Sequence, residues 1–382
     1  MALVLTLFLQ APPFIAPPPF ASLAGHQWKS IQAATLGLKV LAFFSSQDHP
    51  NRAMYLRNLG IWLATRFERT GLMDDLDRAV DAANMAVDAT PQDHPDRAGL
   101  LNNLGNWLGT RFGRTGSMDD IDHALLSYKG GWHCSTASPS IRIRSAREAA
   151  QILASRLTWE DASILLQEAV ELLPTVSPRS LKHTDKQHML ADFSGLASMA
   201  AASALSAGKD AYSALRLLEV GRGVIAGLLM DMRRDISDLR RDHPDLADEF
   251  ILLRDELDSP IDGPILSNPD NTTSSWELQA KRRRGADQKF SELITRIRSK
   301  PGFYNFLLPP TANELIAAAD PDPVVVINVS AYRCNAFLVE RDRIRVLELP
   351  ALKLTEVRQQ ALSLRLSRPT SSSHITTLLK WL

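Results

Sequence analysis

An internal repeat of 45 residues limits what this chain can fold into more than any other feature of its sequence. Asp48-His49-Pro50 recurs as Asp93-His94-Pro95, and 22 of the 32 positions from Asp48 to Ala79 are identical to those from Asp93 to Ala124. A match of this extent indicates duplication. Because a single repeat of this kind cannot bury its apolar face alone, at least three stacked units are expected, of which two are clear.

Each repeat has the pattern of a helical hairpin. In the first unit, apolar residues recur at helical spacing along the first helix (Leu56, Leu59, Leu63 and Phe67). Gly71 is expected to end that helix. Asp74 and Asp75 then lie in the first turn of the second helix, where the helix dipole favours negative charge. The sequence therefore predicts a mostly α-helical chain, an α-solenoid of hairpins.

The spacing resembles that of the tetratricopeptide repeat. Leu59, Gly60 and Leu63 match its first-helix motif, and small residues and a proline match its later positions (Ala79, Ala83, Ala86 and Pro91). That family's unit has about 34 residues, so about seven extra residues are expected in the hairpin turn and about four in the link between units. The repeat segment is placed at 27–138, with clear units at 48–92 and 93–138 and a damaged unit from Gln27 to Phe44. The second unit loses the pattern from Ser127 to Ser138.

A diverged helical region, 139–258, and a linker, 259–300, are expected to follow the repeats. The linker comprises a polar loop and a helix. The expected elements are a hairpin over 139–174, an alanine-rich helix over 188–205 with Gly195 inside it, a helix over 211–232, a helix beginning at Asp242-His243-Pro244, a loop from Ser259 to Ser275 and a helix over 288–298. The basic run Lys281 to Arg284 is interpreted as a solvated face beside that loop.

The hydrophobic period changes at Pro323. Val324 to Val329 is a β-branched run typical of a buried strand. A second strand is expected from Arg333 to Glu340, with Cys334, Ala336 and Leu338 on its inward face, and a third from Ile344 to Leu349; a helix is expected at 352–366. The sequence thus predicts a small α/β segment at 301–382.

Three features resemble TPR–CHAT proteins, which are abundant in mushroom-forming fungi. They are Leu218-Glu219-x-Gly221-Arg222-Gly223, the Trp159-x-x-Ala162 helix and the Asp-His-Pro punctuation. The resemblance implies that residues 301–382 are the N-terminal part of a caspase-like CHAT domain, truncated before its catalytic half. No position matches the family's catalytic His or Cys motif, so no catalytic residue is assigned. The alternative is the front half of a CHAT cysteine peptidase whose catalytic His and Cys lie beyond Leu382.

The repeat and the missing catalytic His and Cys favour a non-catalytic scaffold that binds a protein or peptide, and the composition and motifs disfavour other classes of function. Lys plus Arg and Asp plus Glu balance at 43 each, so no nucleic-acid partner is expected. The sequence has no phosphate-binding loop or dinucleotide glycine motif, and no cofactor is expected. His49, His94 and His243 each precede a proline, which favours a role at helix starts over metal binding. His133-Cys134 is interpreted as a loop pair, and Cys334 as a packed core thiol.

Polar residues on the first helices are the candidate binding residues. In tetratricopeptide arrays the first helices line a concave groove, and the resemblance implies a protein or peptide ligand there. The candidate groove residues are Asn58, Arg66, Asn102, Asn103 and Arg111. Trp62 and Trp107 recur once per repeat and are predicted to pack between helices. The sequence does not determine the oligomeric state.

The N-terminal segment, 1–26, is apolar and proline-rich, and we expect it to be disordered. Its apolar run, Ala2 to Leu9, is too short to span a membrane. A cytoplasmic location is predicted; the alternative is secretion, with Met1 to Ala24 as a signal peptide.

Overall fold

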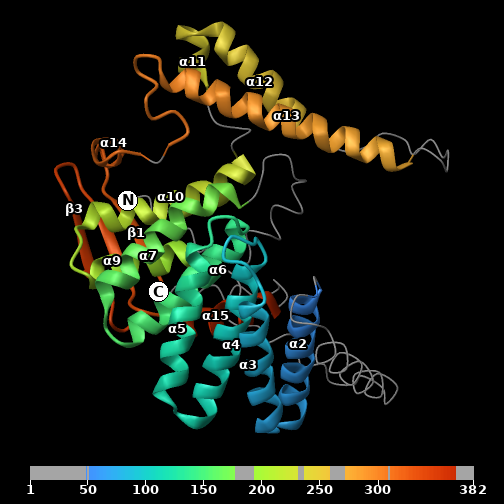
Figure 1. Cartoon of the computed structure of the whole chain (residues 1–382). Coiled ribbons are helices and arrows are strands. Elements are labelled where there is room, and N and C mark those ends of the chain that lie inside the picture. The colour runs from blue at the N-terminus through green and yellow to red at the C-terminus, as the bar shows by residue number, and fades with distance from the viewer. Residues whose placement is uncertain are drawn as a thin grey trace. The chain divides into compact units, whose positions relative to one another are not determined.

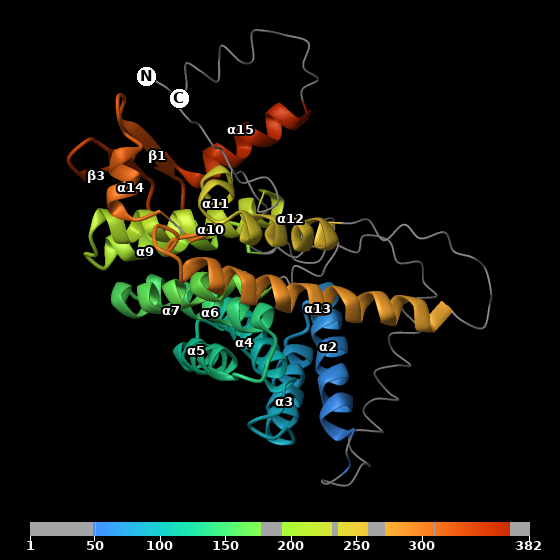
Figure 2. The same cartoon turned by 90° about the horizontal axis from the view of Figure 1, so that it is seen from above.

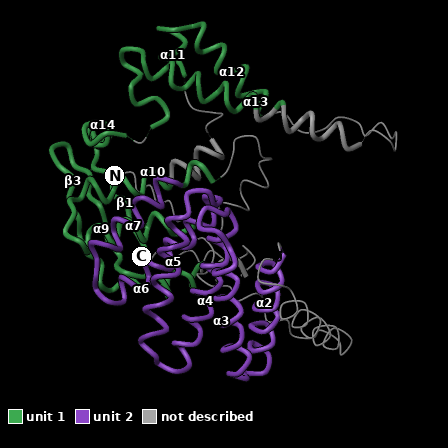
Figure 3. The backbone as a smooth tube through the Cα atoms, in the orientation of Figure 1, with its two compact units in different colours: residues 1–11, 173–382 green, residues 12–172 purple. Residues whose placement is uncertain are grey.

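The computed structural model describes residues 49, 51–176, 193–230, 236–258, 272–308 and 310–366. Helices dominate these residues, and one three-stranded sheet lies toward the C-terminal end (Figure 1). The predicted fold class is confirmed: a mostly helical chain with a small α/β segment. Two compact units divide the chain, one at 12–172 and the other at 1–11 with 173–382 (Figure 3). The leader at 1–26 and the damaged unit at 27–44 lie outside the described residues.

Three helical hairpins make up the described part of the 12–172 unit. Their helices are α2 (Arg52–Thr70), α3 (Met73–Asp88), α4 (Arg97–Thr115), α5 (Met118–His133), α6 (Pro139–Ser155) and α7 (Trp159–Leu172). Each helix packs on the next in chain order, which is the contact pattern of a solenoid. The third hairpin, predicted at 139–174, supplies the third stacked unit.

The turn within each repeat is short. The first helix ends at Gly71, whose φ of 72° is left-handed and whose N–H donates to the Phe67 carbonyl at 2.7 Å. Gly116 ends α4 in the same way, with φ of 73°. Only Gly71 and Leu72 separate α2 from α3, so the predicted lengthening of the turn was wrong. The additional residues lengthen the helices instead, because α2 and α4 each have 19 residues.

Small residues allow the helices of the repeats to approach closely. Ala79, Ala86 and Ala124 are fully buried, and the predicted inward residues of α2 are also buried. A Cβ at Gly60 would lie 2.6 Å from the Trp107 ring, and one at Gly105 would lie 2.6 Å from the ring of a buried tyrosine in α5. Only glycine leaves room for these rings.

The second repeat retains its helical structure beyond the point where the sequence pattern is lost. Helix α5 continues to His133, and its residues Tyr128 and Trp132 are buried. The loss of the repeat pattern from Ser127 is therefore not accompanied by a loss of helix as far as His133. Large aromatic residues replace the small and aliphatic ones of the first repeat and bury comparable surface.

A helical hairpin covers one face of the sheet in the other unit (Figure 2). It comprises α9 (Leu196–Ser206) and α10 (Ala211–Met230); η1 (Leu173–Thr175) also contacts α10. Residues 188–192 of the helix predicted over 188–205 lie outside the described residues; in the described part, α9 begins at Leu196, because Gly195 has a φ of 82° and is the N-cap. Gly221 lies against α9, since a Cβ there would be 2.2 Å from the Cβ of Ala197, so α10 and α9 approach each other closely at this point.

The sheet is an antiparallel meander of β1 (Val324–Asn328), β2 (Asn335–Val339) and β3 (Ile344–Glu348). All three strands were predicted, but the inward face of β2 was partly wrong. Phe337 is fully buried and Val339 is 2% exposed, whereas Leu338 is only half-buried. Ala336 and Phe337 point to opposite faces and are both buried, so this part of β2 is covered on both faces.

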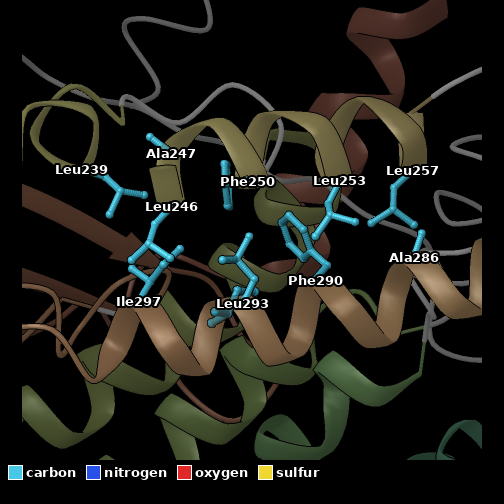
Figure 4. Close-up of a cluster of buried hydrophobic side chains, with 11 residues drawn as sticks. Leu239, Leu246, Ala247, Phe250, Leu253, Leu257, Ala286, Phe290, Leu293 and Ile297 are labelled. Atoms are coloured by element: carbon cyan, nitrogen blue, oxygen red, sulfur yellow. The ribbon is translucent and has the colours of Figure 1, made fainter. Parts of the chain in front are cut away.

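A second hydrophobic cluster joins α11 (Ser237–Asp242), α12 (Pro244–Asp258) and α13 (Thr272–Arg298) (Figure 4). The predicted inward residues of α12 belong to it (Leu246, Phe250, Leu253 and Leu257). Helix α13 has 27 residues. It begins inside the predicted loop and contains the Lys281–Arg284 run, so the predicted start at residue 288 was wrong. Tertiary packing of Phe290 and Leu293 stabilises a helix whose first half lacks an apolar stripe.

Two short helices complete the described fold. Helix α14 (Ala312–Ala317) was not predicted; Thr311 and Glu314 form a capping box at its start. Helix α15 (Leu354–Leu366) was predicted at 352–366. The boundary between the compact units, after Leu172, falls inside the predicted 139–258 segment, so the third hairpin groups with the repeats.

Candidate functional site

The two arginines predicted to line a groove are each bound to an aspartate in the following helix. Nε of Arg66 donates to Oδ2 of Asp75 at 2.6 Å, and a second N–H of the guanidinium donates to Oδ1. Arg111 makes the equivalent bonds with Asp120 at 2.9 and 2.6 Å. These hydrogen bonds raise the pKa of both guanidinium groups. The Asp75 and Asp120 side chains are only 2% and 8% exposed, so each pair links the two helices of one hairpin through a carboxylate that is largely shielded from water.

A second type of ion pair links successive hairpins. Arg111 also donates to Asp77 of the preceding α3 at 3.1 Å. Arg156, at the end of α6, pairs with Asp122 of α5 at 2.6 Å. The two arginines are 45 residues apart, and so are the two aspartates. The contact is therefore periodic, and it places the third hairpin in the repeat series.

In the second and third hairpins, an arginine near the start of the first helix donates hydrogen bonds to backbone carbonyls at the end of the preceding hairpin's second helix. Arg97 donates to the carbonyl oxygens of Val87, at 2.6 Å, and Thr90. Arg142 donates to the carbonyl of Trp132 at 3.0 Å. Arg97 and Arg142 again differ by 45 positions, as do Val87 and Trp132. A cation at these carbonyls satisfies acceptors that a helix end leaves without partners and interacts favourably with the helix dipole.

The predicted asparagines have different environments. Asn102 is only 5% exposed, and its Oδ1 accepts a hydrogen bond from Ser145 of α6 at 3.4 Å. It therefore lies in the packing between hairpins. Asn58 and Asn103 are half-buried on the first helices, and their role in a groove stays a prediction. Of the five predicted residues, only Arg111 lines the cavity described next.

A hollow of about 300 Å³ lies between α3 and α5, with α4 as its floor. Its buried lining is Val80, Leu104, Leu108 and Ser127, and its exposed rim is Asn84, His123 and Leu126. Arg111 contributes to the lining as well. Helices α3 and α5 each pack on α4 but make no extensive contact with each other. The hollow thus opens between second helices, not along the predicted first-helix groove.

The surroundings of the hollow are acidic. Asp77, Asp81 and Asn84 follow one another along one stripe of α3, at spacings of one helical turn. Asp119 is exposed on α5 one helical turn before His123, whereas Asp122 is paired with Arg156. Arg111 is the cation in the lining, but its guanidinium is shared between Asp120 and Asp77. The end of the hollow at Arg111 therefore has a net negative charge.

The repeated tryptophans were predicted to pack between helices. Trp107 does so: its ring lies against Gly60 of α2, in the preceding repeat. Trp62 is half-buried at the equivalent position of the first repeat. These observations support packing and give no indication of ligand stacking at Trp107.

The histidines before proline act at helix starts, as predicted. Nδ1 of His49 accepts the backbone N–H of Asn51 at 3.1 Å, and Nδ1 of His94 accepts that of Asp96 at 3.1 Å. Across the described ranges, no group of three or more metal-ligating side chains is close enough to hold an ion. In the same residues, no helix has the length and hydropathy of a membrane span.

The two cysteines have different environments. Cys334 is 5% exposed, its thiol lies 3.7 Å from the Ser330 carbonyl, and burial raises its pKa, which confirms the predicted core thiol. Cys134 is half-buried and directly follows α5. Nδ1 of the adjacent His133 lies 2.6 Å from the Lys129 carbonyl, so that ring nitrogen already has a partner.

No protein-family model matches this chain, and a search of curated proteins found no relative. The similarity to TPR–CHAT proteins therefore stays a prediction.

The residues that line the hollow, other than Arg111, were not identified from the sequence. Val80, Leu104 and Leu108 occupy ordinary positions of the apolar stripes, so nothing marks them as lining residues. One signal was available. Leu126 is apolar where the first repeat has Asp81, which points to a local change on the outer face of α5.

Proposed function

We propose that this chain is a non-catalytic scaffold that binds a protein or peptide through its array of helical hairpins. The observation that carries the proposal is the hollow between α3 and α5, which combines an apolar floor with a polar rim. Sites of that composition are typical of ligand binding, and about 300 Å³ is at the lower end of their range. A hollow of this size fits one or two side chains of a larger partner.

The ion pairs around the hollow support the same proposal. Arg111 connects α4 to both α3 and α5, so the two walls are fixed to the floor by one side chain. A site whose walls are already positioned loses less conformational entropy when a ligand binds. The array would then act as a preformed surface for its partner.

The test begins with selection of peptides from a displayed library against the folded full-length chain. Affinities of selected peptides are then measured by fluorescence anisotropy for wild type and for Leu126→Gln, a rim change at a 65% exposed position. Met118→Gln is the matched control, since Met118 is 57% exposed on the same helix and does not line the hollow. We expect Leu126→Gln to weaken binding and Met118→Gln to leave it unchanged.

Two other results are informative. If Leu126→Gln has no effect but Asn58→Ala and Asn103→Ala weaken binding, the ligand occupies the first-helix groove and the scaffold function stands. If no peptide is enriched against a chain that circular dichroism shows to be helical, the scaffold proposal fails. The peptidase alternative depends on a His and a Cys beyond Leu382, and the described residues do not bear on it.

A cytoplasmic location belongs to the same proposal. Cys134 and Cys334 are free thiols, which suits a reducing compartment. Determining the N-terminus of the mature protein tests this: a mature chain that begins after Ala24 would indicate secretion instead.

A further inference from the structure

We propose that the hollow between α3 and α5 takes one apolar side chain from a basic segment, in which a leucine-sized residue lies between lysines or arginines. This inference rests on the proposed scaffold function and specifies the chemistry of the partner. It combines two independent observations, the apolar lining of the hollow and the sign of the charges around it.

The lining requires an apolar anchor. Val80, Leu104 and Leu108 form the floor and are 3%, 5% and 3% exposed. Leu126 on the rim is 65% exposed, although the first repeat has an aspartate at the equivalent position. An apolar side chain seated in the hollow would contact the floor and remove part of Leu126 from water. Burial of this kind is the main favourable contribution to most associations.

The charges around the hollow require a basic context for that anchor. Asp81 lies on the α3 rim between Asp77 and Asn84, and Asp119 lies one helical turn from His123 on α5. Lysines or arginines on either side of the anchor would approach these exposed carboxylates. Opposite charges at the rim of an interface raise the association rate and select against partners of the wrong charge.

Arg111 does not make the hollow a site for an acidic partner. Its guanidinium already donates two hydrogen bonds to Asp120 and one to Asp77. Two carboxylates already balance the single positive charge of Arg111, so an incoming carboxylate would add a third negative charge to the same guanidinium. It would also approach Asp81, which lies one helical turn beyond Asp77 on α3. Like charges at that distance disfavour the complex.

The test uses the full-length chain and three short labelled probe peptides. The first has a central leucine between lysines, the second replaces the leucine with serine, and the third replaces the lysines with glutamates. We expect the first probe to bind, the serine probe to bind about tenfold more weakly, and the glutamate probe not to bind. Binding of the first probe should weaken as salt concentration increases, because exposed charges are screened.

Variants of the chain locate the probe. Leu126→Gln should weaken binding of the leucine probe. It should not weaken binding of the serine probe, because that probe has no apolar side chain to contact Leu126. Asp81→Lys should weaken the leucine probe about threefold at low salt and less at high salt. Asp161→Lys is the matched control, because Asp161 is exposed on α7 and makes the same change in net charge away from the hollow.

The possible failures are distinguishable. If a display-selected peptide binds but the lysine probe does not, or if the glutamate or serine probe binds equally well, the scaffold function stands and this inference is overturned. If neither selected peptides nor the lysine probe bind a folded chain, both proposals fall.

Discussion

Replacement of Arg66 should destabilise the repeat array more than replacement of any surface arginine. In the variant Arg66→Gln, the carboxylate of Asp75 would lose both hydrogen bonds that it accepts from the guanidinium. The Asp75 side chain is 2% exposed, so water cannot readily replace those bonds. Removing one partner of a buried ion pair leaves an uncompensated charge, which typically costs about 3–5 kcal/mol.

Two features of the structure reduce that cost. Asp75 lies in the first turn of α3, where the helix dipole stabilises a carboxylate by about 0.3–1 kcal/mol. The Arg66 side chain is 22% exposed, so part of the pair is already hydrated. We therefore expect a loss of about 2–4 kcal/mol in the free energy of unfolding. Asp75→Asn should cost less, about 1–2 kcal/mol, because the remaining arginine can reach water.

The assay is urea unfolding of the full-length chain, followed by circular dichroism, with transitions of the two compact units fitted separately. A double-mutant cycle over Arg66→Gln and Asp75→Asn isolates the energy of the pair. The matched control is Arg78→Gln, because Arg78 pairs with Asp74 at 3.3 Å on the same helix but both side chains are more than half exposed. That change should cost less than about 0.5 kcal/mol. The reasoning is refuted if Arg66→Gln costs no more than Arg78→Gln.

Three further predictions concern packing, reactivity and titration. Gly105→Ala should destabilise the chain by about 1–3 kcal/mol, because its Cβ would overlap a tyrosine ring. Gly113→Ala on the same helix has open space around it and should stabilise the chain by up to about 1 kcal/mol. Thermal unfolding of both variants tests the two signs. Under native conditions a maleimide should label Cys134 well before Cys334, whose thiol is buried and has a raised pKa; equal rates, read by mass spectrometry, would contradict this. Hydrogen bonds from two arginines lower the pKa of Glu340 from 4.5 to about 2. The stability that the ionised Glu340 contributes should therefore be complete above pH 4.5 and be lost as the pH falls toward 2. An NMR titration that gave Glu340 an ordinary pKa would contradict this prediction.

The hairpin architecture was predictable from the sequence because the repeat fixes the period of each element. The apolar spacing in α2 and the glycines at 71 and 116 define where helices begin and end. Long-range packing accounts for the errors. Helix α13 begins 16 residues before its predicted start at 288, because its stability comes from contacts with α12, which no local pattern in its first half reveals.

Arg66 was predicted to line a groove because it is a polar residue on a first helix, and the error in turn length concealed its ion pair. Arg66 and Asp75 are nine positions apart, on different helices. With about seven extra residues in the turn, the two side chains would lie far apart, so a polar residue on α2 would face solvent. With a turn of only Gly71 and Leu72, the same two residues meet across the hairpin. The ion pair between Arg66 and Asp75 therefore depends on a turn length that the comparison with the shorter repeat did not predict.

The hollow could not be predicted for a related reason, since its residues come from three helices and depend on the angle between two hairpins. Arg111 largely fixes that geometry. Its bonds to Asp77 hold α3 against α4, and its bonds to Asp120 hold α5 against α4. Arg66 makes only the bond within its own hairpin among the contacts described. Loss of Arg111 should therefore reduce stability and ligand binding together, whereas loss of Arg66, which does not line the hollow, should reduce stability alone.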